Sequence, residues 1–249
     1  MKICLVGFIM DVESKTHFGL VLRPRTRGYH LTRENYASLT NRSSFGKNYI
    51  YIDALQSNDE KILRIFADVY SDSEGLIYTD KRCEKYLTEA MENFDLNMDF
   101  FRKLDRNKFD HEVDSFIKKT KFKQIADLRD CCYSGYYVMI LDNYCQIYIG
   151  TSNNIKERIK QHWSGGKIRL DRLVCGSVNT SKLSIDSFRS LDTTRILVYK
   201  TKRTYSSEDE YIQYFSKDFR CNRVCGGLFS GDKPFSIDEL DRYDFRSFE

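Results

Sequence analysis

The amino-acid sequence predicts a mixed α/β (α+β) protein with two domains, and three observations support this prediction. The chain has 249 residues, which is enough for two modest domains or one large one. In residues 1–128, short strand-like runs alternate with segments of helical periodicity. Residues 129–249 instead follow the order strand, strand, helix, strand, helix.

The composition is typical of a globular protein without a membrane-spanning segment. Hydrophobic residues make up 41% of the chain and charged residues 31%, which argues against a disordered tail. The two prolines, Pro24 and Pro234, are too few for a proline-rich linker. No apolar run approaches the roughly 20 residues of a membrane span, and residues 2–10 predict a first strand rather than a secretory signal. We therefore expect a cytoplasmic protein.

The 8 cysteines do not predict a structural zinc site. None of them forms a Cys-x-x-Cys pair, the spacing usual for such sites. The nearest candidate is Cys221-x-x-x-Cys225, for which we favour buried or free thiols in a reducing compartment over a bound metal.

In the first half of the chain, strands are expected at residues 2–10, 48–53 and 75–78. A capping box formed by Ser57 and Glu60 predicts a helix that continues to Phe66. From Asp80 to about Asp127 the apolar residues recur at helical spacing in three segments. This half contains no nucleotide-binding loop, metal box or nucleophile elbow, so its residues alone assign it no function.

In the second half, strands are expected at residues 136–141, 145–149 and 195–200. The first two flank Asp142-Asn143, a pair typical of a hairpin turn. A tight turn at residues 150–153 then precedes a helix that carries Ile155, Ile159 and Trp163 on one side. We interpret Trp163 as a packing residue.

A second helix and a long connection complete this half. The helix is expected to begin at Ser206 or Ser207, and its buried stripe consists of Tyr211, Ile212 and Phe215. The connection, roughly residues 167–191, separates the first helix from the third strand. Within it, residues 183–188 indicate a short helix that either contacts nucleic acid or only packs, and the sequence favours neither.

A basic stretch lies between residues 154 and 172 of this half. Its bases are Lys156, Arg158, Lys160, Lys167, Arg169 and Arg172, opposed only by Glu157 and Asp171. Such a stretch attracts phosphate backbones, although by itself it is more often a solvated helix face. The net charge of +4 is too mild to decide between these interpretations.

Two tripeptides in the predicted hairpin carry a specific resemblance. Gly135-Tyr136-Tyr137, ten residues, and Tyr148-Ile149-Gly150 resemble the signature of the GIY-YIG nuclease family, with Tyr136 at a packing position in place of the isoleucine. Further residues match the family in register: Thr151 to Ile155, Arg158, His162, Glu208, Asn222 and Gly226-Gly227. The resemblance covers roughly residues 133–228. It implies a nuclease domain over residues 129–249, with a small three-stranded antiparallel sheet flanked by helices.

The resemblance also implies roles for individual residues in hydrolysing DNA. Tyr137 is expected to be the base and Tyr148 to orient the attacking water. Arg158 offers a planar set of donors for phosphate oxygens. His162 is expected at the catalytic site, and Glu208 is the expected ligand of a divalent cation, Mg²⁺ with Mn²⁺ as a substitute.

Four other residues are expected to bind the DNA substrate. They are Lys156, Lys160, Lys167 and Asn222. Taken alone, each of these residues also has a structural interpretation, such as a solvated helix face for the lysines or a backbone-bonding turn residue for Asn222. For Asn222 the shared register with the family favours the functional interpretation, and for the lysines the basic stretch that contains them does so.

Glu210 is the alternative to Glu208. Counted from Glu208, the three residues of the buried stripe follow at three, four and seven positions, which places Glu208 on the core face of the helix. Glu210 is rotated from it by about two hundred degrees, although its distance to Asn222 fits some relatives better. We therefore favour Glu208.

The sequence thus predicts a two-domain endonuclease in which residues 1–128 recognise the target or regulate cutting. Two alternatives remain open. One is a non-catalytic nucleic-acid-binding module that kept the fold, and the other is a nuclease that acts on RNA. Oligomeric state and target sequence have no visible signature in the chain.

Overall fold

The computed structural model describes residues 14–22, 29–33, 36, 60, 79–164, 173–174, 176–202, 208–224 and 228–229. The strands expected at residues 2–10, 48–53 and 75–78 lie outside these ranges, as does the helix expected after Ser57, apart from Glu60. None of the helices within the described ranges combines the length and apolar character needed to cross a lipid bilayer.

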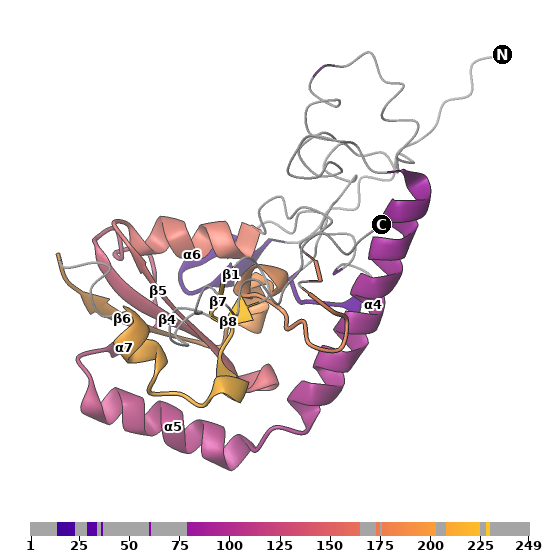
Figure 1. Cartoon of the computed structure of the whole chain (residues 1–249). Helices are drawn as coiled ribbons and strands as arrows, with labels where there is room; N and C mark the ends of the chain where they lie inside the picture. The colour runs from indigo at the N-terminus through magenta and orange to yellow at the C-terminus, as the bar shows by residue number, and fades with distance from the viewer. Residues whose placement is uncertain are drawn as a thin grey trace.

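A four-stranded antiparallel sheet lies at the centre of the described structure (Figure 1). Its strands in spatial order are β3 (Lys123–Ile125), β6 (Arg195–Lys200), β4 (Gly135–Leu141) and β5 (Gln146–Ser152). The three predicted strands are present, but the prediction of a three-stranded sheet was wrong. The fourth strand, β3, is three residues long and becomes a strand by pairing with β6, more than seventy residues later in the chain.

The hairpin of β4 and β5 turns through a 3₁₀ helix, η3 (Asp142–Tyr144), which contains the predicted turn residues. Cys145 follows with a positive φ of 49°. The Asp142 carboxylate accepts hydrogen bonds from Thr194 and Arg195 at the start of β6. These bonds tie the turn of the hairpin to the neighbouring strand.

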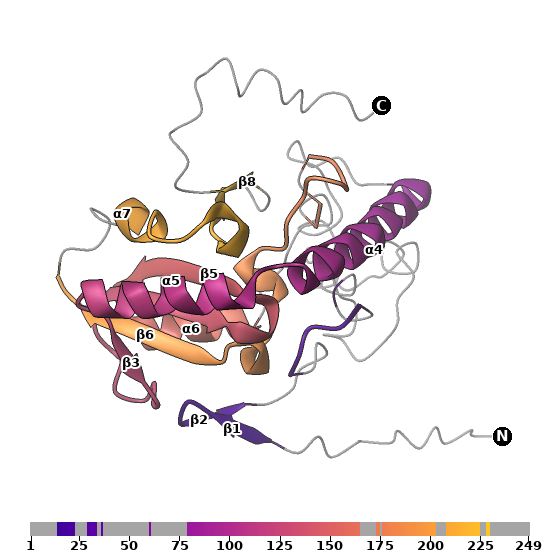
Figure 2. The same ribbon diagram turned by 90° about the horizontal axis from the view of Figure 1, so that it is seen from below.

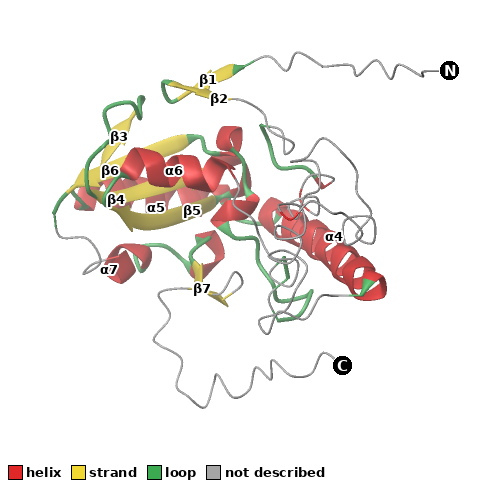
Figure 3. Cartoon of the chain, turned by 90° about the horizontal axis from the view of Figure 1, so that it is seen from above, coloured by secondary structure: helices red, strands yellow, loops and turns green. Residues whose placement is uncertain are grey.

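The two faces of the sheet are covered by different helices. On one face Tyr137 and Met139 pack in a common core with Ile155 and Ile159 of α6 (Ile155–Ser164). The opposite face carries Tyr136, Val138 and Ile140, because side chains alternate along a strand. That face packs against α5 (Arg106–Lys119) and the region of α7 (Glu208–Ile212). Figure 2 shows α5 across one face, and Figure 3 shows α6 across the other.

The helical region before the sheet consists of two helices rather than three segments. Helix α4 spans Asp80–Arg102 without a break, and α5 begins after Asp105, whose side chain accepts a hydrogen bond from the Lys108 amide. The apolar pattern of α4 is interrupted because Asn93 and Asn97 are buried on its core face. The side-chain nitrogen of Asn93 and both polar side-chain atoms of Asn97 form hydrogen bonds with backbone groups of residues 178–183, which compensates the burial of those three atoms.

A short N-terminal hairpin, which the sequence did not predict, packs on the face that α6 covers. Its strands are β1 (Lys15–His17) and β2 (Leu20–Leu22), joined by Phe18 and Gly19, both with positive φ as this hairpin turn requires. The Phe18 ring stacks on Trp163 of α6, and its carbonyl accepts a hydrogen bond from the Leu128 amide. The hairpin therefore docks on the sheet domain.

The division of the chain into domains at residues 1–128 and 129–249, with recognition or regulation in the first and cutting in the second, stays a prediction. In packing, the described segments on both sides share hydrophobic cores. Leu31, Tyr36 and Phe94 belong to the same core as Tyr137, and β3 completes the sheet. The remaining short elements are 3₁₀ helices η5 (Ile185–Ser187), η6 (Ser190–Asp192) and η7 (Lys217–Phe219), and strands β7 (Arg223–Val224) and β8 (Leu228–Phe229).

Candidate active site

Tyr137 and Tyr148 lie on neighbouring strands and on the same face of the sheet. Tyr137 pairs with Gly150, and Tyr148 pairs with Met139, two residues along β4. The centroids of the two tyrosine rings are 6.0 Å apart. Gly150 is required beneath the Tyr137 ring, since a β-carbon there would lie 2.5 Å from the Tyr137 hydroxyl oxygen. The glycine of the second tripeptide thus makes room for the tyrosine of the first.

Helix α6 supplies His162, whose buried imidazole joins the two tyrosines. Its Nε2 is hydrogen-bonded to the Tyr137 hydroxyl at 2.8 Å. The centroid of the Tyr148 ring is 4.9 Å from that of the imidazole, in an edge-to-face arrangement. The other ring nitrogen, Nδ1, lies 2.6 Å from Oδ1 of Asp186. His162 is therefore held between a phenol and a carboxylate.

The sequence did not single out Asp186 as a site residue. It lies in η5, within residues 183–188, for which contact with nucleic acid and packing were equally favoured. Leu183, Ile185 and Phe188 are buried in the core, which supports packing for the apolar residues of this segment. The only local signal was one acidic residue between buried apolar positions, and that pattern does not specify a partner on another element.

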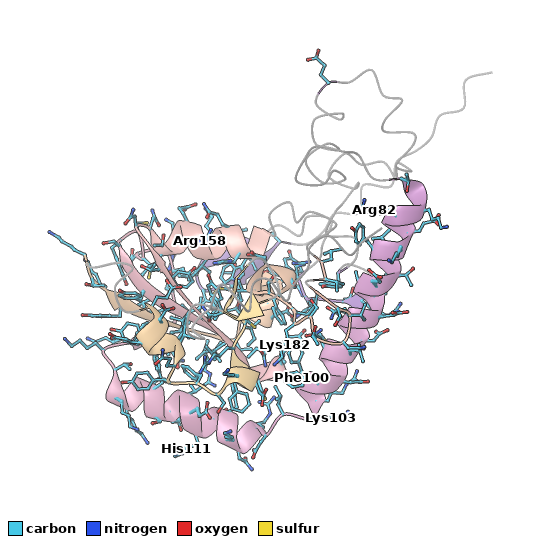
Figure 4. The ribbon with its side chains drawn as sticks, viewed as in Figure 1. Arg82, Phe100, Lys103, His111, Arg158 and Lys182 are labelled. Atoms are coloured by element: carbon cyan, nitrogen blue, oxygen red, sulfur yellow. The ribbon has the colours of Figure 1, made fainter. Side chains whose placement is uncertain are left out.

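Arg158 lies one turn before His162 on α6, toward solvent. Figure 4 shows it on the opposite side of the sheet from His111 of α5. Its Nη1 donates a hydrogen bond to Oε1 of Gln161 at 3.2 Å. Together with the start of α6 and the end of β5, Arg158 lines a surface depression of about 460 Å³. A guanidinium at such an edge can bind phosphate oxygens through parallel hydrogen bonds.

The electrostatics of the site keep both phenols protonated near neutral pH. Burial raises the pKa of Tyr137 well above its ordinary value, and the nearby Arg158 charge opposes this only in part. Burial and the Glu208 carboxylate raise the pKa of Tyr148 to about 12, again opposed by Arg158. A buried phenol in this site therefore cannot act as a base unless its own proton has an acceptor.

Glu208 is the first residue of α7, a helix that packs against β5. Burial raises the pKa of this carboxyl, the neighbouring Asp209 raises it further, and Arg158 lowers it. Glu208 raises the pKa of Tyr148, and Arg158 lowers the pKa of both Tyr148 and Glu208. The three side chains therefore interact electrostatically with one another. The alternative residue, Glu210, is exposed, and its charge raises the pKa of Tyr211 instead.

Five residues expected at the catalytic site thus come from four elements of the fold, β4, β5, α6 and α7. Comparison with protein families shows that the model of the GIY-YIG catalytic domain matches residues 133–222. Residues 133–222 are a GIY-YIG catalytic domain. No curated protein and no solved structure is significantly similar to the chain. The departure from the signature, Tyr136, is a buried packing residue on the opposite face, stacked on Tyr199.

In the GIY-YIG domain, Asn222 lies against the backbone of β5 rather than on an open surface. Its Oδ1 accepts a hydrogen bond from the Ile149 amide at 3.0 Å, and its Nδ2 donates one to the Ile149 carbonyl. The adjoining Cys221 amide donates to the Ile147 carbonyl, so this segment runs along the free edge of β5. Asn222 thereby fastens the chain after α7 to the strand that carries Tyr148.

Replacing Asn222 with alanine is expected to lower the free energy of unfolding by about 2–4 kcal/mol, because it leaves the buried Ile149 amide and carbonyl unsatisfied. Urea denaturation measures this change. The matched control is Asn143→Ala, which makes the same substitution at an exposed turn residue and is expected to change stability by at most about 0.5 kcal/mol. Equal losses in the two variants would contradict the fastening role.

The lysines expected to bind substrate in the GIY-YIG domain lie on α6. Lys156 Nζ contacts the Arg129 carbonyl at 3.5 Å, and Lys160 Nζ forms an ion pair with Glu157 at 2.9 Å. Both contacts are of the surface type. An incoming phosphate can therefore replace them at a small cost in free energy. Lys167 lies outside the described residues.

Proposed function

We propose that this chain is a metal-dependent endonuclease that hydrolyses DNA phosphodiester bonds. A GIY-YIG catalytic domain makes the chain a nuclease, a phosphodiester hydrolase acting on nucleic acid. The observation that carries the proposal is the proximity of Tyr137 and Tyr148 on one face of the sheet, together with the electrostatic interactions that join them to Arg158 and Glu208. It offers groups for the water, the phosphate and a cation at the same place.

Each side chain has a distinct part in the proposed reaction. Tyr137 accepts a proton from the attacking water, and the Tyr148 hydroxyl holds that water in line with the phosphorus. Arg158 donates hydrogen bonds to the phosphate oxygens, where negative charge increases in the transition state. Its guanidinium remains charged at any working pH.

Glu208 fits a divalent cation by its chemistry. Its half-buried carboxylate forms no hydrogen bond or ion pair with another described residue, and burial disfavours its charge. Among the described residues, no group of three or more His, Cys, Asp or Glu side chains is placed to hold a metal ion. Glu208 is the protein ligand that we propose. Mg²⁺ is commonly held by one or two carboxylates with water and substrate phosphate. When bound, the ion supplies positive charge to the phosphate and the leaving oxygen.

The basic side of α6 supports nucleic acid as the substrate. Lys156 and Lys160 extend from the same helix as Arg158, so a phosphate backbone that reaches Arg158 meets further cations along the helix. Binding through such contacts weakens as salt rises. We propose that the part of residues 1–128 outside the shared core recognises the target or regulates the reaction.

The test is cleavage of supercoiled plasmid DNA by the full chain. With Mg²⁺ we expect nicked and linear products, with Mn²⁺ a similar pattern, and with excess EDTA no products. Single-stranded and double-stranded RNA are offered in parallel. Retarded DNA that is never cut with either ion would favour a non-catalytic binding module, and cutting confined to RNA would favour the RNA nuclease.

A further inference from the structure

The buried imidazole of His162 has a carboxylate on one side and a phenol on the other. Its two hydrogen bonds measure 2.6 Å to Asp186 and 2.8 Å to Tyr137, and the His162 side chain is 3% exposed. The three groups come from η5, α6 and β4, so the chain of hydrogen bonds depends on the tertiary fold. This arrangement gives a proton on Tyr137 a defined route.

The chemistry of the two partners fixes the direction of both hydrogen bonds. An ionised carboxylate only accepts, so Nδ1 of His162 must carry a hydrogen and donate it to Asp186. In a neutral imidazole the other nitrogen is then an acceptor, so Nε2 presents its lone pair to Tyr137. The Tyr137 hydroxyl therefore donates to His162. Without a carboxylate at residue 186, nothing in this arrangement would select that tautomer over the opposite one.

We propose that Asp186 is a positioning residue of the nuclease reaction, which holds His162 in the tautomer that accepts the proton of Tyr137. The proposal rests on the proposed hydrolysis and on Tyr137 as its base. Because the first signature tyrosine is buried and protonated, it requires this acceptor. Asp186 acts through His162 and is not expected to contact the DNA.

The proton balance of the step is complete with water as the co-substrate. One O–H bond of the attacking water breaks, and its proton binds the Tyr137 oxygen. The original O–H bond of Tyr137 breaks, and that proton binds Nε2 of His162. The water oxygen forms a bond to phosphorus, the bond from phosphorus to the leaving oxygen breaks, and the leaving oxygen takes a proton from solvent. The resulting imidazolium is stabilised by the Asp186 carboxylate and later returns its proton to solvent.

The tautomer can be observed without any activity, through the ¹⁵N chemical shifts of the histidine rings. The chain has 4 histidines, so assignment through the backbone is tractable. In the wild-type protein we expect the neutral ring form of His162 to carry its hydrogen on Nδ1. In Asp186→Asn we expect a mixture that includes the opposite tautomer. A wild-type His162 with its hydrogen on Nε2, or an imidazolium in the resting enzyme, would overturn the proposal.

The kinetic test measures single-turnover cleavage together with DNA affinity in Ca²⁺. Asp186→Asn is expected to slow cleavage by about 10²-fold, the contribution usual for a proton-transfer group, with affinity unchanged. The control is Asp99→Asn, which makes the same substitution at an exposed ion pair on α4 and should keep the full rate. A full cleavage rate in Asp186→Asn would refute the positioning role.

Epistasis separates this role from a merely structural one. Asp186→Asn combined with His162→Gln is expected to be no slower than His162→Gln alone, because Asp186 acts only through that ring. A further loss in the double variant would contradict the proposal. If the wild-type chain cuts no nucleic acid, the proposed function fails, while the ring ¹⁵N spectra still decide whether Asp186 sets the tautomer.

Discussion

Arg158→Ala is expected to reduce single-turnover cleavage of DNA by about 10²–10³-fold, the loss usual on removing one donor to a transition-state oxyanion. The positive charge of Arg158 lowers the pKa of both signature tyrosines, Tyr137 and Tyr148, and so opposes the increase that burial causes. No other described guanidinium has this effect on the two phenols. Its removal therefore takes away the phosphate-binding donors and the charge that favours proton transfer from the water.

The same substitution should leave the fold intact. Arg158 is exposed, and its guanidinium donates a hydrogen bond to Gln161 on the same helix. The free energy of unfolding in urea is expected to change by about 0.5 kcal/mol or less. Arg102→Ala is the matched control, since Arg102 is an exposed helical arginine bonded to Asp99 three residues away. It should cut at the wild-type rate.

Two outcomes would contradict this role of Arg158. Equal cleavage by wild type and Arg158→Ala would remove the residue from the catalytic site. A loss that disappears when DNA is saturating would assign Arg158 to substrate binding alone, because a group that acts in the transition state lowers the rate of the bound complex.

The parts of the fold that the sequence predicted are those set by local spacing. The tyrosines of the two tripeptides, the helix with Arg158 and His162, and strand β6 each depend on residues close together in the chain. Tyrosines at the alternating positions of a short hairpin lie on one face whatever the surroundings, because the side-chain period of a strand is two. The proximity of the two tyrosines was accordingly predictable before the fold was known.

The parts that the sequence did not predict depend on long-range pairing. Strand β3 has exposed Lys123 and Gln124, so nothing in its three residues marks it as a strand until β6 lies beside it. In α4 the buried Asn93 interrupts the apolar periodicity, and its side-chain nitrogen donates hydrogen bonds to backbone carbonyls 85 and 88 residues away. Local patterns carry no information about such partners.

The site residues follow the same division. Glu208 was favoured over Glu210 on helical phase alone, and the structure places Glu208 half-buried and Glu210 exposed. Asp186 was missed because its partner His162 is 24 residues away on another element. Asn222 was expected to bind substrate, and its hydrogen bonds to Ile149 became visible only with the fold.

Glu208→Gln is expected to abolish most Mg²⁺-dependent cleavage, with a loss of about 10²–10³-fold, because an amide is a weak ligand for a hard cation. The substitution preserves shape and removes only the charge. DNA affinity in the absence of divalent cations should not fall, since removing a carboxylate near the phosphate reduces repulsion. The measurement is the cleavage rate against Mg²⁺ concentration, with DNA binding in EDTA measured separately.

Stability should move in the opposite direction to activity. The folded-state pKa of Glu208 is raised, chiefly by burial, so its ionised form is disfavoured by folding. This destabilisation is absent below the ordinary glutamate pKa and complete above the raised one, so stability falls as pH rises through that window. At pH 7 the Glu208→Gln variant should therefore be at least as stable as wild type in urea. Wild type and variant should converge in stability at acidic pH.

Glu210→Gln provides the control, because it removes the same charge two residues away on an exposed side of α7. It should retain both Mg²⁺-dependent cleavage and wild-type stability. Full activity in Glu208→Gln together with loss in Glu210→Gln would reverse the assignment of the cation ligand. Full activity in both would mean that neither glutamate is needed to hold the cation. A carboxylate kept half-buried at a cost to stability is better explained by a cation that it binds than by packing.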